Sequence, residues 1–127
     1  MHVVDELFVG DKFRTNVWIA KKPQKELKKF VERGEGRRFL QKLQYYARAG
    51  FDEFEGDRNP IRNEGWGTWR IAEPFSLFRL IGFYEGVGKE SFIVIDAFAK
   101  SGTGLSAAER GRIRQVARVK RDGLWTR

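Results

Sequence analysis

Two arginines stand in neighbouring predicted strands, at positions where a core strand would carry an apolar side chain. Arg70 lies within the segment TWRIAE and Arg79 within FSLFRLIGFYE. Pro74 cannot donate to a strand ladder, so a tight turn is expected between Glu73 and Ser76. With those two residues facing each other, the register sets Arg70 directly opposite Arg79. Like charges that face each other on a sheet are destabilising, so the pair invites an anion, and phosphate is the obvious candidate.

Neutralisation by solvent or by a carboxylate is the alternative interpretation of the two arginines. The next turn is expected to set Tyr84 opposite Ser91, and its glycines can take the positive φ values that such turns need. This register places Asp96 opposite Arg79, where the carboxylate could neutralise the guanidinium. From the residues alone, a phosphate site and a neutralised pair are equally open.

The elements that must position these side chains follow from the spacing of apolar residues. Strands are expected over three consecutive segments and over one earlier edge segment: 68–73, 76–84, 91–98 and 17–20. Helical spacing predicts two amphipathic helices over about 23–33 and 36–49. Together these segments predict an α+β fold, with two N-terminal helices packed on an antiparallel sheet.

The segments outside this frame have weaker patterns. Residues 1–16 alternate only weakly and are expected to be an N-terminal extension, with a short strand over 6–9. Residues 51–67 are polar and are broken by Pro60 and by glycines, so an ordered loop pinned by Trp66 is expected there.

A basic helix is expected at the C-terminal end. Ser106 and Glu109 match a capping box, which predicts a helix that runs to about Arg121. Its arginines recur at helical spacing and form one stripe: Arg110, Arg114, Arg118 and Arg121. Residues 100–127 hold eight basic and two acidic side chains, so they carry +6 of the chain's net charge of +8. A solvated helix face usually mixes signs, so the stripe is a candidate RNA-binding surface or a contact for an acidic partner.

The composition excludes several classes of chemistry. The 127 residues contain no cysteine and one histidine, His2, so thiol catalysis, a disulfide framework, a zinc site and a histidine base within the fold are not expected. No cofactor and no metal are expected. Charged residues interrupt the N-terminal segment, and no apolar stretch is long enough to span a bilayer. We therefore expect a single cytoplasmic domain with no membrane partner.

Four segments, in the order GTWRI, FRLIGFYEG, IVIDAFAKS and AAERGRI, give the chain a family resemblance. It resembles the RelE/HigB-type toxins of bacterial type II toxin–antitoxin systems, especially the phage-derived HigB-like branch. That branch shows an aromatic-hydrophobic-arginine strand, an aromatic-arginine-hydrophobic strand, an apolar strand that ends in phenylalanine before lysines, and a helix with an early glutamate. The resemblance covers residues 17–119. It implies a RelE/ParE-like fold and a RelE/HigB-like toxin domain over 17–127, preceded by the extension over 1–16.

The resemblance implies an endoribonuclease that enters the ribosomal decoding site and cuts mRNA. The reaction is attack of a ribose 2′-OH on the adjacent phosphate, which needs a base, an acid and stabilisation of charge on phosphorus. By position, Arg79 matches the arginine that holds the scissile phosphate, Arg70 the basic residue of the preceding strand, and Lys100 the lysine after the last strand. The chain has Ser101 where the branch has a second lysine and Asp96 where it often has a histidine, so Asp96 or Lys100 would act as the base.

The resemblance also implies partners, namely a cognate antitoxin, expected to be a helix-turn-helix protein, and the ribosome with its mRNA. Two other functions are compatible with the same residues. A ParE-like module of the same fold blocks a protein target such as gyrase by contact and cuts nothing, and a nucleic-acid-binding protein of unrelated function would also use clustered arginines. The pair Arg70 and Arg79 favours the nuclease, whereas the missing histidine or tyrosine acid favours the binding module.

Overall fold

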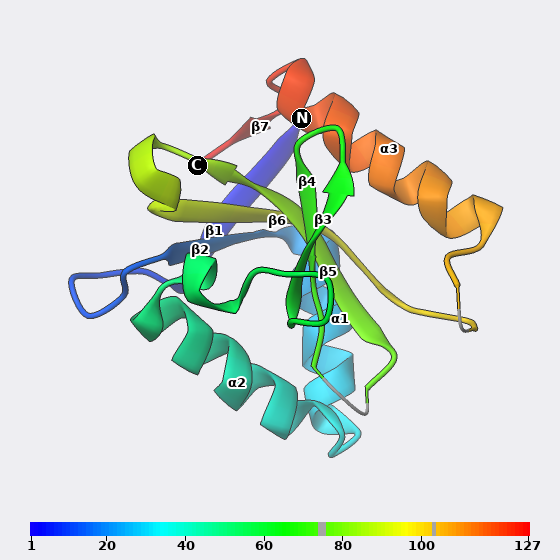
Figure 1. Cartoon of the computed structure of the whole chain (residues 1–127), viewed down its shortest axis with the longest axis horizontal. Coiled ribbons are helices and arrows are strands. Elements are labelled where there is room, and N and C mark those ends of the chain that lie inside the picture. Colours follow the sequence, from blue (N-terminus) through cyan, green and yellow to red (C-terminus); the bar gives the residue numbers. More distant parts are fainter. Residues whose placement is uncertain (74–75, 103) are drawn as a thin grey trace.

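A seven-stranded sheet with helices on both faces is the frame of the molecule in the computed structural model (Figure 1), which describes residues 1–73, 76–102 and 104–127. The strands lie in the order β3-β4-β5-β6-β2-β1-β7 across the sheet. Their bounds are β1 (His2–Phe8), β2 (Asn16–Ala20), β3 (Ile61–Gly65), β4 (Thr68–Ile71), β5 (Phe78–Glu85), β6 (Ser91–Ala99) and β7 (Trp125–Thr126). The helices are α1 (Lys21–Glu32), α2 (Gly36–Ala49) and α3 (Ala107–Arg121), with short 3-10 turns η1 (Phe51–Phe54) and η2 (Val87–Lys89).

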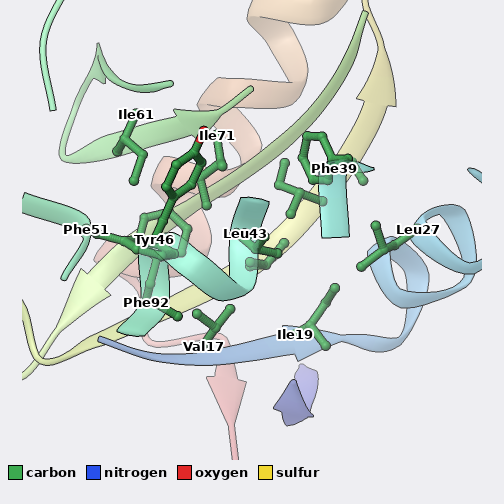
Figure 2. Close-up of a cluster of buried hydrophobic side chains, with 14 of the residues drawn as sticks. Val17, Ile19, Leu27, Phe39, Leu43, Tyr46, Phe51, Ile61, Ile71 and Phe92 are labelled. Atoms are coloured by element: carbon green, nitrogen blue, oxygen red, sulfur yellow. The ribbon is translucent and has the colours of Figure 1, made fainter. Parts of the chain in front are cut away.

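Different helices cover the two faces of the sheet. α1 and α2 pack against one face, where the core includes Val17, Leu43 and Phe92 (Figure 2). α3 covers the opposite face, where Ile113 packs in a cluster with Ile81 of β5. Each helix places an apolar stripe against the sheet and leaves most of its charged residues in solvent, as amphipathic spacing requires, with Glu109 of α3 as a buried exception. The strand residues therefore alternate between two cores, and a charged residue on either face must be explained.

The sheet is mixed, which corrects the predicted antiparallel sheet. β2 runs parallel to β6, and β1 runs parallel to β7, while the other pairs are antiparallel. Two strands also precede α1, so the chain does not begin with the predicted pair of helices. The α+β class is confirmed, but the predicted arrangement of two N-terminal helices on an antiparallel sheet is wrong. Local alternation of residues does not encode strand direction, and parallel partners are joined only through long crossover connections.

Two strands arise from segments without a strong strand pattern. β1 has Val4 as its buried residue and β3 has Ile61, so neither segment shows the alternation that marks a half-buried strand. β1 consequently differs from the short strand predicted over 6–9. The predicted loop over 51–67 contains β3, and Trp66 is 65% exposed, so the indole does not pin this segment.

The register between β4 and β5 differs by two residues from the prediction. Arg70 faces Ile81 instead of Arg79, because the connection between the two strands is longer than a two-residue turn. Pro74, on which the predicted turn depends, lies outside the described residues. A shift of two residues leaves each side chain on its own face of the sheet. Arg70 and Arg79 therefore still share one face, the one that carries Ile81 and α3.

The three helices lie close to their predicted ranges. The capping box at the start of α3 is confirmed, because the Glu109 backbone N–H donates to the Ser106 hydroxyl at 3.1 Å and the Ser106 N–H donates to the Glu109 carboxylate at 2.9 Å. Within the described ranges, none of the helices combines the length and the apolar character that crossing a membrane requires.

Candidate phosphate-binding site

A pocket of about 330 Å³ lies where β4 ends, β5 begins and β6 ends. We call this cavity the basic pocket, because five of its lining residues are basic: Arg58, Arg62, Arg70, Arg79 and Lys100. Among the described residues, Glu73 is the one acidic side chain that lines it. Three of the four predicted catalytic residues meet here, and their combined charge suits an anion such as phosphate.

Strand pairing brings the arginines together. Arg62 on β3 is the direct cross-strand partner of Arg70 on β4. Arg79 lies two residues before Ile81, which faces Arg70, so Arg79 is the diagonal neighbour of Arg70 on the same face. The predicted facing pair is thus replaced by Arg62 and Arg70, with Arg79 beside them. Like charges at such separations destabilise a sheet unless a counter-charge lies between them.

Arg70 is the most enclosed cation of the basic pocket, with 8% of its surface exposed. Its Nε lies 2.9 Å from Oε1 of Glu64 but outside hydrogen-bond geometry, so this buried N–H has no hydrogen-bond partner among the described residues. Burial lowers the pKa of Arg70, the Glu64 charge opposes that shift, and the Arg62 charge adds to it. The Glu64 carboxylate therefore lies near more than one cation and cannot neutralise them all.

Arg79 is anchored by the backbone at the start of its own strand. Its Nη1 donates hydrogen bonds to the carbonyl oxygens of Ser76, at 2.6 Å, and of Phe78, at 2.9 Å. Its buried Nε has no hydrogen-bond partner in the described part of the chain. Burial lowers the pKa of Arg79, and the charges of Arg70 and Arg62 lower it further. Two backbone carbonyl oxygens thus hold Nη1, so the guanidinium has a defined position in the wall of the basic pocket.

Lys100 enters the pocket from the end of β6. Its backbone N–H donates to the carbonyl oxygen of Leu77 at 2.7 Å, which ties this end of β6 to the residue before β5. Burial lowers the pKa of the Lys100 ammonium, and the charges of Arg70 and Arg79 lower it further. A lysine with a lowered pKa gives up its proton more readily, which suits a general acid beside a phosphate.

Glu73 is a candidate functional residue that the sequence pattern identifies only as a turn residue. It is 6% exposed, and its Oε1 lies 2.9 Å from Nε of Arg38 on α2. A carboxylate at the wall of a phosphate pocket can accept a proton from a hydroxyl group. No sequence signal separates it from other glutamates, because its place in the pocket depends on how the chain connects β4 to β5.

Asp96 lies on the same face of the sheet but does not line the basic pocket. Its two oxygens accept hydrogen bonds from Arg112 on α3, at 2.7 and 2.8 Å, and Nζ of Lys22 is 3.7 Å away. These hydrogen bonds raise the pKa of Arg112. Across the strands Asp96 faces Ile81, so it is not the counter-charge of Arg79. The predicted catalytic role of Asp96 gains no support from this position.

The predicted RNA-binding stripe of α3 is exposed at all four of its residues, Arg110, Arg114, Arg118 and Arg121. The last two pair with Asp122, at 3.6 and 3.0 Å respectively. The first two lie beside the exposed ring of Trp66, and the guanidinium carbon of Arg114 is 5.6 Å from the ring centroid. The stripe therefore divides into a part with carboxylate partners and a part that meets an aromatic side chain.

Comparison of the chain with protein-family models, with curated proteins and with solved structures finds no match. The RelE/HigB-type resemblance stays a prediction from the sequence. Across the described ranges, no three histidine, aspartate or glutamate side chains are grouped so that they could hold a metal ion.

Proposed function

We propose that the chain is an endoribonuclease toxin, which cuts mRNA on the ribosome by attack of a ribose 2′-OH on the adjacent phosphate. The observation that supports this function is the basic pocket, in which Arg70, Arg79 and Lys100 line one cavity together with Glu73. A phosphodiester suits this arrangement because its non-bridging oxygens can accept hydrogen bonds from more than one guanidinium group at once.

Each pocket residue has a chemical role that follows from its position and its charge. Glu73 accepts the proton of the 2′-OH while that oxygen forms its bond to phosphorus. Arg70 and Arg79 stabilise the negative charge that develops on the phosphoryl oxygens. Lys100 donates a proton to the 5′-oxygen as its bond to phosphorus breaks, which leaves a 2′,3′-cyclic phosphate and a 5′-hydroxyl. Asp96 takes no part in this scheme, because Arg112 already holds both of its oxygens.

The ribosome supplies the geometry of the substrate in this proposal. The basic pocket contains no histidine, so much of the rate must come from holding the 2′-OH in line with the phosphorus. A flexible RNA strand in solution does not maintain that alignment. We therefore expect translated mRNA to be cut and unbound RNA to be cut little.

An antitoxin is the second expected partner, and by the sequence resemblance it is a helix-turn-helix protein. A groove of about 520 Å³ beside the basic pocket offers a place for it, lined by residues of α1 and by the start of β5. Glu73 lines both cavities, and Leu77 in the groove is 59% exposed. A protein seated there would lie against the proposed base. Rescue of growth by the product of a neighbouring gene tests this, and failure of every neighbour to rescue would count against it.

The test of the nuclease maps transcript cleavage after induced expression of the wild-type chain, Arg79→Ala and Arg48→Ala. Arg48 is an exposed arginine of α2 outside the basic pocket, so its removal matches the change in net charge. Wild type and Arg48→Ala should arrest growth and cut translated mRNA. Arg79→Ala should stay folded and cut about 10²–10³-fold more slowly, the effect of removing one charge-stabilising group. Unchanged cleavage by a folded Arg79→Ala chain would refute the assignment.

A second candidate function is a binding module that blocks a target without cutting, as a ParE-like inhibitor of gyrase would. One observation favours it, because the carboxylate of Glu73 is already engaged by Arg38 at 2.9 Å. The same expression experiment separates the two functions. Growth arrest by the wild-type chain without cleavage of any transcript would identify the binding module.

A further inference from the structure

The turn between β3 and β4 presents a tryptophan to solvent. Trp66 is 65% exposed, whereas tryptophan is on average a highly buried residue. The backbone is left-handed at three consecutive residues, with φ of 89° at Gly65, 54° at Trp66 and 76° at Gly67. This conformation is uncommon for a residue other than glycine and persists only where the surrounding structure enforces it.

Local hydrogen bonds enforce this turn. The Gly65 N–H donates to Oδ1 of Asn63 at 2.7 Å, and the Thr68 hydroxyl donates to the Gly65 carbonyl at 2.7 Å. The Lys120 ammonium of α3 donates to the Gly67 carbonyl at 3.3 Å, which ties the turn to the helix beside it (Figure 1). The indole therefore has a defined place next to α3 before any ligand binds.

Arginines of α3 surround the exposed ring. Arg114 lies over it, with the guanidinium carbon 5.6 Å from the ring centroid. A hollow of about 210 Å³ brings the ring together with Glu64 and Arg110, and a second of about 360 Å³ brings it together with Arg114 and Arg121. A π-face among cations provides the two components of a single-strand binding surface, a platform for a base and charges for the phosphates.

The ring is connected to the basic pocket through one ion pair. Glu64 lines the hollow beside Trp66, and its carboxylate pairs with Arg70, which lines the basic pocket. Arg62 and Trp66 are four residues apart, so their backbones lie at most about 13 Å from each other, the span of a fully extended segment. One RNA strand with a phosphate in the basic pocket can therefore bring a nearby base onto the ring.

We propose that Trp66 is a base-stacking subsite for the single-stranded RNA whose phosphate occupies the basic pocket. This inference rests on the proposed function and adds a substrate preference to it. Phosphate contacts position RNA without reading its bases, whereas a stacking ring accepts only a base that is splayed out of a helix. Arg110 and Arg114 hold the phosphates next to the stacked base. Because every base has a π-face, the subsite selects unpaired RNA and not a particular sequence.

The test measures, by fluorescence anisotropy, the affinity for a short single-stranded RNA whose 2′-O-methyl groups prevent cleavage. A second oligonucleotide of the same length and charge lacks the central bases. The wild-type chain should bind the complete oligonucleotide about 10-fold more tightly than the abasic one, the effect of one base–aromatic stack. Trp66→Ala should lose this preference and Trp66→Phe should retain part of it. Tyr45→Ala, which removes an exposed aromatic of α2, should behave as wild type.

The outcomes separate the subsite from the proposed function. If Trp66→Ala keeps the full preference for bases, the inference is overturned while phosphate binding by the basic pocket stands. If Trp66→Ala weakens binding of an antitoxin and leaves RNA binding unchanged, the turn is a protein contact and the inference is again overturned. If the wild-type chain binds neither oligonucleotide, the inference fails together with the assignment of the basic pocket to RNA. Loss of the preference with an unchanged salt dependence supports it, because no phosphate contact is removed.

Discussion

Two groups of charged side chains on the α3 face of the sheet have opposite electrostatics. In the basic pocket, burial and neighbouring cations lower the pKa values of Arg70, Arg79 and Lys100. In the second group, hydrogen bonds to Asp96 raise the pKa of Arg112. The fold thus favours the charged form of Arg112 and disfavours that of the pocket cations, although both groups lie on the same side of one sheet.

The difference shows how a cation that serves the fold can be told from one that serves a ligand. Nε and Nη2 of Arg112 both donate to the carboxylate of Asp96. Arg112 therefore has its hydrogen-bond partners within the chain, and its removal should destabilise the fold. Arg70 and Arg79 each keep a buried N–H without a hydrogen-bond partner among the described residues, and other cations surround them. An anion in the pocket would offset the charge that these cations share, so their removal should damage binding instead.

Replacement of a carboxylate by its amide should lower mRNA cleavage strongly at Glu73 and hardly at all at Asp96. The loss at Glu73 is the largest effect we expect. Glu73→Gln removes the proposed base and should lower mRNA cleavage by about 10²–10⁴-fold, the usual range for general acid–base catalysis. Asp96→Asn should leave cleavage per folded molecule close to wild type, because Asp96 does not line the basic pocket. Mapping of cleaved ends on a translated transcript measures both variants. Similar losses in the two variants would remove the distinction between the regions.

Removal of one arginine from each region should separate stability from function. Arg112→Ala should lower the free energy of unfolding by about 1–3 kcal/mol, because the Asp96 carboxylate, 8% exposed, loses both arginine donors and keeps only the Ala97 backbone N–H, at 2.8 Å, as a hydrogen-bond donor. Lys22, at 3.7 Å, offsets part of this loss. Arg79→Ala should change the free energy of unfolding less, because it also relieves repulsion within the pocket.

Urea denaturation measures both free energies, and the double variant Arg112→Ala, Asp96→Ala sharpens the result. It should be more stable than Arg112→Ala alone, because it also removes the buried carboxylate that has lost its arginine partner. Equal destabilisation by Arg79→Ala and Arg112→Ala would show that the pocket cations also serve the fold.

Lys100→Met should give the smallest effect, a gain in stability of about 0.5 kcal/mol or less near neutral pH. The folded chain lowers the pKa of Lys100, so it binds that proton less tightly than the unfolded chain does. The wild-type penalty is complete below the folded pKa and disappears as the pH rises from there towards the ordinary lysine value. Urea midpoints of both chains at neutral and alkaline pH measure this. If the stability of Lys100→Met relative to wild type increased with pH, the change would be opposite to the one we expect.

Periodicity in the sequence is sufficient for elements that are amphipathic over a long segment. The helix predicted over 36–49 is confirmed as α2, and the capping box at Ser106 is confirmed at the start of α3. The shared face of Arg70 and Arg79 was also predictable, because the register error of two residues leaves side chains on their faces. These features depend on local spacing alone.

The remaining features depend on contacts between distant segments. Parallel pairing of β2 with β6 and of β1 with β7 is not encoded in the alternation of any one strand. Arg62 joins the basic pocket because β3 pairs with β4, in a segment whose polar composition predicts a loop. Asp96 pairs with Arg112, sixteen residues later, because α3 crosses the sheet at that point. The positions of Arg62 and Glu73 in the site therefore could not be predicted from the sequence without the three-dimensional structure.

The proposed function requires that the basic pocket holds an RNA phosphate, and the salt dependence of RNA binding reports on that contact. Affinity for a short single-stranded RNA is measured over a range of salt concentrations for the wild-type chain, Arg79→Ala and the charge-matched control Arg48→Ala. Loss of one phosphate contact should reduce the slope of log affinity against log salt by about 0.7 in Arg79→Ala. Arg48→Ala should keep the wild-type slope. Unchanged slope and affinity in a folded Arg79→Ala chain would contradict the account.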